Sequence, residues 1–154
     1  MTTPAIDELK TRARLRLNRA RADEPALQLR DCLVAVARDV GFADWEHARR
    51  VLGGSARNGN DLGTFWYAPR CATLLNEWFS EYGQARESLE RSRGSFLLPY
   101  ARQFVVVLDD FVRELGMDPA QPAWAECGRD LVVGYGTPAW QRLCADRLRA
   151  TRGA

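Results

Sequence analysis

The sequence predicts an all-α fold in which a three-helix head packs on a four-to-five-helix body. Apolar residues recur at steps of three and four positions along most of the 154-residue chain, as on the buried face of an amphipathic helix. Prolines and glycines stand where the predicted helices begin and end. Hydrophobic residues make up 46% and charged residues 27% of the chain, a balance typical of a globular protein with a packed core.

The first 52 residues predict three helices, which form the head. The apolar stripe of the first helix consists of Ile6, Leu9, Ala13, Leu17 and Ala20. Pro4 suits the start of that helix. A second helix is expected over residues 23–40, and Gly41 suits the left-handed conformation that ends a helix. Asp44 can cap a third helix over residues 45–52.

Residues 53–63 predict a flexible linker, because glycine and asparagine dominate this stretch and almost nothing in it can be buried. The linker divides the chain into the head, residues 1–52, and the body, residues 64–154. The head alone is near the lower size limit for independent folding. We therefore expect it to pack on the body as one compact unit.

The body predicts four to five helices. The first two are expected over residues 69–82 and 84–91, and the longest over residues 98–115. Its β-branched run, residues 105–107, favours a strand. A strand at residues 105–107 would not account for residues 109–115, however, so we predict a helix over the whole stretch of residues 98–115.

The last part of the body predicts two more helices. One is expected around Trp124, after a turn at residues 118–122. The other begins at Thr137-Pro138, because threonine caps a helix and proline fits its first position.

Composition and motifs argue against several classes of protein. The longest apolar run is far shorter than the ~20 residues that cross a bilayer, and the N-terminus lacks a secretory signal; we expect a cytoplasmic protein. Four widely spaced cysteines and a single histidine, His47, predict no metal site and no cofactor. The sequence carries no common enzyme motif, so we lean against catalysis.

The most specific local signal is Gly41-Phe42-Ala43-Asp44 followed by Trp45. With these residues, the segment over residues 9–52 resembles a small bacterial helical module that ends in Gly-Phe-x-Asp/Ser-Trp and occurs in some glyoxalase-superfamily and ankyrin-repeat proteins. The resemblance implies a fold for the head, with Phe42 and Trp45 in its core. It implies no activity, because glyoxalases bind metal through histidine and glutamate side chains on strands.

An alternative interpretation of the same segment is a helix-turn-helix, since it also resembles the second half of that motif in arabinose-regulator-type activators. A DNA-binding regulator of this kind would place Glu46, His47, Arg49 and Arg50 in the major groove. Trp45 suits packing better than base recognition. Residues 23–57 also carry a slight net negative charge, which suits a polyanion poorly.

We therefore predict a non-catalytic binding or adaptor protein with a partner-facing groove between head and body. The candidate partner-binding residues are Arg12, Arg16, Arg19, Arg49 and Arg50. The first three lie on one face of the first helix, which could equally be a solvated face. The expected partner is another protein; a homodimer is possible, and nucleic acid is less favoured.

A second alternative is a small-molecule binder or enzyme with an aromatic pocket in the body. The candidate pocket residues are Trp66, Trp78, Tyr82, Tyr100 and Arg102. Aromatic and arginine side chains are common in binding sites. The simpler interpretation is that these rings fill the core of the body.

Overall fold

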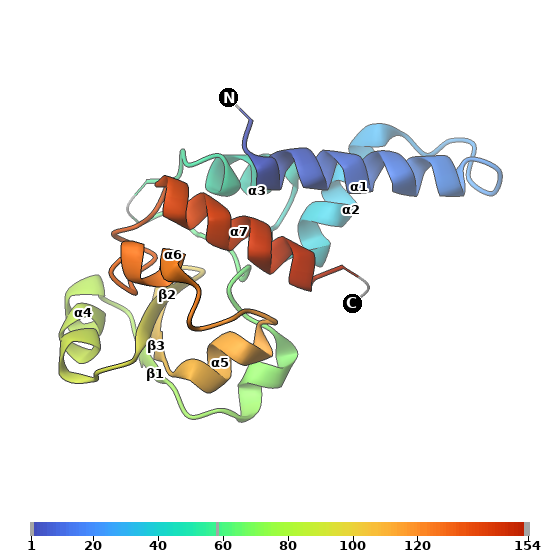
Figure 1. Cartoon of the computed structure of the whole chain (residues 1–154). Coiled ribbons are helices and arrows are strands. Elements are labelled where there is room, and N and C mark those ends of the chain that lie inside the picture. The colour runs from blue at the N-terminus through green and yellow to red at the C-terminus, as the bar shows by residue number, and fades with distance from the viewer. Residues whose placement is uncertain (1, 58, 153–154) are drawn as a thin grey trace.

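Residues 2–57 and 59–152, which the computed structural model describes, form seven α-helices, a short 3₁₀ helix and one three-stranded antiparallel sheet (Figure 1). The predicted all-α fold is therefore wrong, because the body is built around the sheet. The elements in chain order are α1 (Pro4–Ala20), α2 (Leu29–Asp39), α3 (Trp45–Leu52), η1 (Pro69–Thr73), β1 (Glu77–Phe79), α4 (Tyr82–Arg91), β2 (Phe96–Tyr100), β3 (Gln103–Val107), α5 (Asp109–Glu114), α6 (Pro122–Glu126) and α7 (Pro138–Ala150).

The three helices predicted in the head are confirmed, although α2 begins at Leu29 and not at residue 23. The Asp31 carboxylate fixes that start by accepting a 2.9 Å hydrogen bond from the Gln28 main-chain N–H. Asp44 caps α3 as predicted, since its carboxylate accepts a 2.8 Å bond from the His47 N–H. Gly41, just after α2, has the expected positive φ of 103°.

The helix predicted over residues 98–115 does not form. This stretch instead completes β2, turns at Ala101-Arg102, forms β3 and only then enters α5. Ala101 has a φ of 52°, which allows the tight turn, and Tyr100 pairs with Gln103 across it. The β-branched residues 105–107 prefer a pleated, buried setting, and this preference outweighs the helical spacing of the neighbouring aromatic residues.

The helix predicted over residues 69–82 is also wrong. Within residues 69–81 only η1 is helical, and Leu74 leaves it in an extended conformation (φ −92°, ψ 149°) that leads into β1. β1 pairs with β3, so the sheet order is β1-β3-β2 with β3 in the centre. The predicted helices over 84–91, around Trp124 and after Thr137 are present as α4, α6 and α7.

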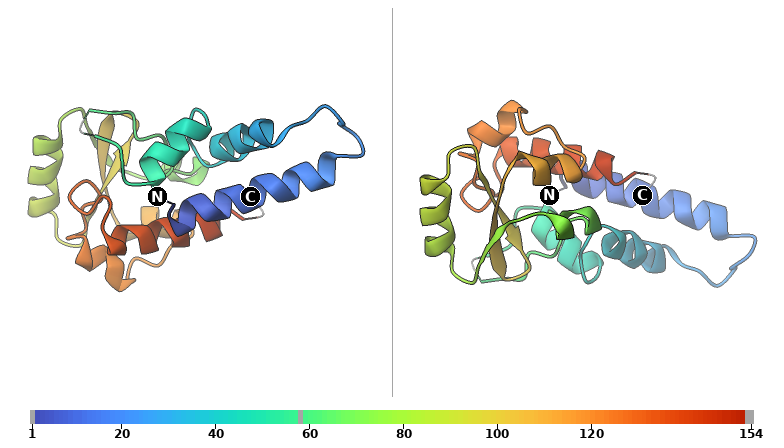
Figure 2. Two further views of the ribbon diagram at one scale, coloured as in Figure 1. Left: turned by 90° about the horizontal axis from the view of Figure 1, so that it is seen from above. Right: turned by 90° about the horizontal axis from the view of Figure 1, so that it is seen from below.

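The sheet separates a small and a large apolar cluster. α4 packs on one face of the sheet, over Leu97 and Val106 (Figure 2). The other face joins a core that is continuous from Ala5 in the head to Leu148 in the body. α1 packs against α2, α3 and α7, so head and body share this core.

Hydrogen bonds also tie residues 53–63 to the body. The Tyr135 hydroxyl donates to the Val51 carbonyl oxygen (2.6 Å) and accepts from the Ala56 N–H (3.0 Å). The tip of the β2–β3 hairpin exchanges main-chain bonds with this segment, because Leu62 N donates to Ala101 O and Ala101 N donates to Gly63 O. Asn58, within the predicted linker, lies outside the described residues.

Candidate functional site

An open groove of about 1000 Å³ lies between the head and the body. Its lining comes from α1, α2, the chain around η1, the end of α5 and the end of α7, which Figure 1 shows converging near the C-terminus. The groove is rich in arginine: Arg12, Arg38, Arg70, Arg113, Arg147 and Arg152. The lining includes two acidic residues, Asp39 and Glu114, so the positive charges outnumber the negative ones.

Two glycines fix the walls of the groove by close packing. A Cβ on Gly41 would lie 2.7 Å from the main-chain carbon of Thr64, so the turn after α2 can approach the body only without a side chain. Gly116, which has a φ of 78°, packs against α7, and a Cβ there would lie 2.6 Å from the Ala150 Cβ. The lining residues of head and body are thus held at a fixed separation.

Arg147 is the buried arginine of the groove, with 9% of its surface exposed. Its guanidinium donates to three main-chain oxygens: Phe65 O (2.9 Å), Leu115 O (2.9 Å) and Tyr67 O (3.0 Å). Burial lowers the pKa of this guanidinium from its ordinary value. These three bonds use three of its five N–H groups.

Arg12 joins the head to the end of α7. It donates to the Thr151 hydroxyl (2.9 Å) and the Leu148 carbonyl oxygen (2.6 Å), and it forms a 2.8 Å ion pair with Glu8. Burial lowers the pKa of the Arg12 guanidinium, while the nearby Asp39 carboxylate acts in the opposite direction. Arg12 therefore both holds the groove together and contributes its positive charge.

The exposed arginines of the groove differ in how they are partnered. Arg152 forms an ion pair with Glu8. Arg38 donates from Nε to the Ala43 carbonyl oxygen, and Arg113 lies 3.6 Å from the Asp109 carboxylate. Within residues 2–57 and 59–152, no carboxylate oxygen lies within 4.0 Å of the guanidinium of Arg38, Arg70 or Arg147. These three charges thus have no acidic partner in the described part of the chain.

The partner-binding candidates from the sequence divide between the groove and other surfaces. Arg12 lines the groove, and Arg16 forms a 3.0 Å ion pair with the groove residue Asp39. Arg19, Arg49 and Arg50 are exposed and are not among the lining residues.

Contacts around α3 do not favour the DNA-binding alternative. Arg49 makes bidentate hydrogen bonds to Glu46, which raise the pKa of Arg49. His47 is buried, and both of its ring nitrogens are engaged: Nδ1 accepts from the Ala43 N–H, and Nε2 lies 2.7 Å from the Asp61 carbonyl oxygen. Phe42 is buried and Trp45 is half-buried against the core.

Sequence reasoning missed most of the groove arginines. These arginines come from four separate segments and form no local motif: Arg38, Arg70, Arg113, and the pair Arg147 and Arg152 at the end of α7. Only the tertiary structure brings them together.

The aromatic pocket candidates do not form one pocket. Trp78 and Tyr100 contact each other, with ring centroids 5.1 Å apart, whereas Trp66 is buried in the main core beside Trp124. Tyr82 lies on the α4 face of the sheet. Arg102, at the hairpin turn, donates to the Gly59 carbonyl oxygen (2.8 Å).

Tyr82 belongs instead to a buried polar cluster around Asp130, a residue with 0% exposure. The Tyr82 hydroxyl donates a 2.6 Å hydrogen bond to the Asp130 carboxylate, and Arg86 donates to the same oxygen (3.0 Å). The main-chain N–H groups of Val132 and Val133 bond the other oxygen. The Asp130 carboxylate is therefore fully partnered, and this cluster ties α4 to the segment that follows α6.

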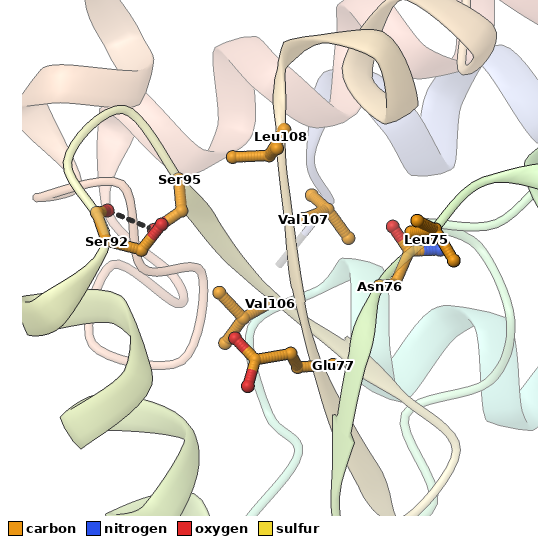
Figure 3. Close-up of a pocket in the computed structure, with 8 residues that line it drawn as sticks. All are labelled: Leu75, Asn76, Glu77, Ser92, Ser95, Val106, Val107 and Leu108. Carbon is orange, nitrogen blue, oxygen red and sulfur yellow. Dashed lines mark hydrogen bonds between the residues drawn. The ribbon is translucent and has the colours of Figure 1, made fainter.

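A second, smaller pocket of about 180 Å³ lies at one end of the sheet (Figure 3). Its polar groups are mostly engaged within the protein: Ser95 Oγ donates to Ser92 O (2.6 Å), and Glu77 accepts from the Ser88 hydroxyl (2.8 Å). Asn76 Oδ1 has no hydrogen-bond partner among the described residues, and its side-chain nitrogen donates to Leu74 O. The volume falls below the ~300 Å³ of typical ligand pockets, so the groove is the stronger candidate.

Three further features bear on cofactors and compartments. No group of three or more histidine, cysteine, aspartate or glutamate side chains in residues 2–57 and 59–152 is arranged to hold a metal ion. All four cysteines are buried free thiols. None of the helices in the described ranges combines the length and the apolar character of a transmembrane helix.

No protein-family model matches the chain, and no significant match exists among curated proteins or solved structures. The resemblance of residues 9–52 to the bacterial helical module therefore stays a prediction.

Proposed function

We propose that this chain is a non-catalytic binding protein that holds a negatively charged segment of a partner protein in the groove between head and body. The observation that carries the proposal is that three arginines of this groove, Arg38, Arg70 and Arg147, lack an acidic partner in the described part of the chain. Carboxylates of a bound segment would supply the missing counter-charges.

The size and openness of the groove favour a chain segment over a small compact ligand. A volume of about 1000 Å³ is at the upper end of the ~300–1000 Å³ range of small-molecule sites. The exposed arginines Arg38, Arg70 and Arg113 would attract an acidic segment over a distance. Arg147, which is desolvated, would make the stronger short-range contact.

Calorimetric titration with hexaglutamate, as a model acidic segment, tests the proposal. We expect the affinity to fall roughly tenfold or more between 50 and 300 mM salt, because ions screen exposed charges. The double variant Arg38→Ala/Arg70→Ala should weaken binding by about tenfold, since each exposed charge pair contributes roughly 0.5–1 kcal/mol.

A matched control removes the same amount of charge elsewhere. Arg49→Ala/Arg50→Ala also lowers the net charge by two, but on α3 outside the groove, and should leave hexaglutamate binding within about twofold of the parent. Equal losses of affinity in the two double variants would mean that hexaglutamate binding depends only on the net charge of the protein. That result would contradict the proposal. A loss confined to the α3 pair, together with binding of duplex DNA, would support the helix-turn-helix alternative instead.

A further inference from the structure

Three partly exposed aromatic rings form a patch beside the groove, which we call the aromatic patch: Tyr67, Trp78 and Tyr100. Their centroids lie 5.1 Å (Trp78–Tyr100), 5.3 Å (Tyr67–Tyr100) and 6.4 Å (Tyr67–Trp78) apart. Trp78 keeps 43% of its surface exposed, whereas Trp66, Trp124 and Trp140 are buried. Leaving a large indole half in water sacrifices stabilisation that burial would give.

The sheet places Trp78 on the face opposite α4. Trp78 pairs with Val105, which belongs to the large core, while the neighbouring pair Phe79–Phe104 faces α4. Tyr100, at the end of β2, packs edge-to-face on Trp78. Because β1 is a three-residue strand at the edge of the sheet, one side of Trp78 has no neighbouring strand to cover it.

Tyr67 connects the aromatic patch to the groove. It is a lining residue of the groove, and its carbonyl oxygen accepts the hydrogen bond from Arg147 Nη2. Its ring contacts both Trp78 and Tyr100. The arginine-lined groove therefore adjoins an exposed apolar surface, and tryptophan, tyrosine and arginine are the residues most enriched in binding hot spots.

We propose that the acidic segment carries an aromatic or large apolar side chain at one end, which packs on Trp78 while the carboxylates lie along the groove arginines. This inference rests on the proposed function, because the charge of the groove defines the acidic part of the ligand. The aromatic patch defines the adjoining apolar part. A purely acidic segment would leave Trp78 exposed, and a purely apolar one would leave the arginines unpaired.

Calorimetry with three synthetic peptides tests the inference: hexaglutamate, and hexaglutamate extended by one phenylalanine at either its N- or its C-terminus. We expect one of the extended peptides to bind at least ~10-fold tighter than hexaglutamate, as burial of a phenylalanine ring allows. In Trp78→Ala this advantage should disappear, while hexaglutamate itself keeps its affinity. Leu15→Ala, which truncates a similarly exposed side chain on α1, is the control and should preserve the advantage.

Fluorescence gives a second measurement that requires no truncation of Trp78. The phenylalanine peptide should protect the parent protein from acrylamide quenching, because it covers an exposed indole, and hexaglutamate should not. In Trp78→Phe this protection should be lost. The conservative replacement keeps a ring at the site, so it reports on Trp78 even where the alanine variant fails to fold.

The outcomes separate the two proposals. Absence of hexaglutamate binding overturns the proposed function. Equal affinities of the three peptides, or an advantage of the phenylalanine peptide that survives Trp78→Ala, overturns the aromatic anchor and leaves the acidic groove standing.

Discussion

Arg147 on α7 donates a 2.9 Å hydrogen bond from Nε to the carbonyl oxygen of Phe65, which lies 82 residues earlier in the chain. The same guanidinium bonds the carbonyl oxygens of Tyr67 and Leu115, so one side chain connects α7 to the segment before η1 and to the end of α5. The residue that lies buried in the groove is therefore also a structural link between its walls.

Replacing Arg147 by methionine should destabilise the fold, because three main-chain oxygens lose their donor at once. We expect a loss of roughly 3 kcal/mol in the free energy of unfolding, measured by urea denaturation. Arg149→Met on the same helix is the control, since Arg149 is exposed and its ion pair with Asp146 should contribute under ~1 kcal/mol. Equal losses in the two variants would show that Arg147 does not hold the three oxygens.

Gly41→Ala should also destabilise the fold, and the reason is spatial. The alanine Cβ would lie 2.7 Å from Thr64, in addition to the strain of a φ of 103°. Gly136→Ala provides the control, because Gly136 also has a positive φ (79°) but has no atom within 4 Å of its Cβ position. We expect Gly41→Ala to cost at least about 2 kcal/mol more than Gly136→Ala in urea denaturation; equal costs would contradict the close approach.

The sequence predicted the head well because its signals are local. Gly41 and Asp44 end one helix and begin the next through contacts within a few residues, so their chemistry can be recognised from the chain alone. The body depends on distant contacts. Whether residues 105–107 enter a helix or a strand is decided by pairing with β1 and β2, and the helical spacing of their neighbours pointed the other way.

The groove could be predicted only in outline. Its position between head and body follows from the division of the chain into two parts, and Arg12 was recognisable as part of a basic helix face. Arg70 and Arg147, 77 positions apart in sequence, stand in ordinary helical contexts. They stand out only because no carboxylate oxygen lies within 4.0 Å of either guanidinium in the described structure, which is a property of the fold.

Alkaline pH should weaken the fold through Tyr82. Burial and the hydrogen bond to Asp130 raise the pKa of Tyr82 from 10.0 to about 12. Between these values the folded chain keeps a proton that the unfolded chain has lost, so this contribution to stability is complete below pH 10 and is lost as the pH rises toward 12.

Urea denaturation at several pH values checks this prediction. The free energy of unfolding should fall more steeply between pH 10 and 12 in the parent protein than in Tyr82→Phe, which has no phenol at this position. Burial raises the pKa of Tyr135 in the same direction in both proteins, so the comparison isolates Tyr82. Identical slopes would contradict the contribution of the Tyr82–Asp130 bond.

The four cysteines should be unreactive in the folded protein. All are buried, and burial raises the pKa of Cys71, Cys127 and Cys144, so little thiolate is present near neutral pH. Titration with a coloured thiol reagent should detect almost no thiol in the native state and four in urea. Rapid labelling of any thiol before unfolding would contradict the packing of that residue.

The most direct test of the groove is to map a bound acidic segment by nuclear magnetic resonance. On titration with hexaglutamate, the amide signals of Thr64, Gly116 and Thr151, which line the groove, should shift and should return when salt is added. The signals of Arg49 and Arg50 on α3 should stay in place. Shifts confined to α3, or no shift of the groove signals at millimolar peptide, would contradict the account of the groove as an acidic-segment binding site.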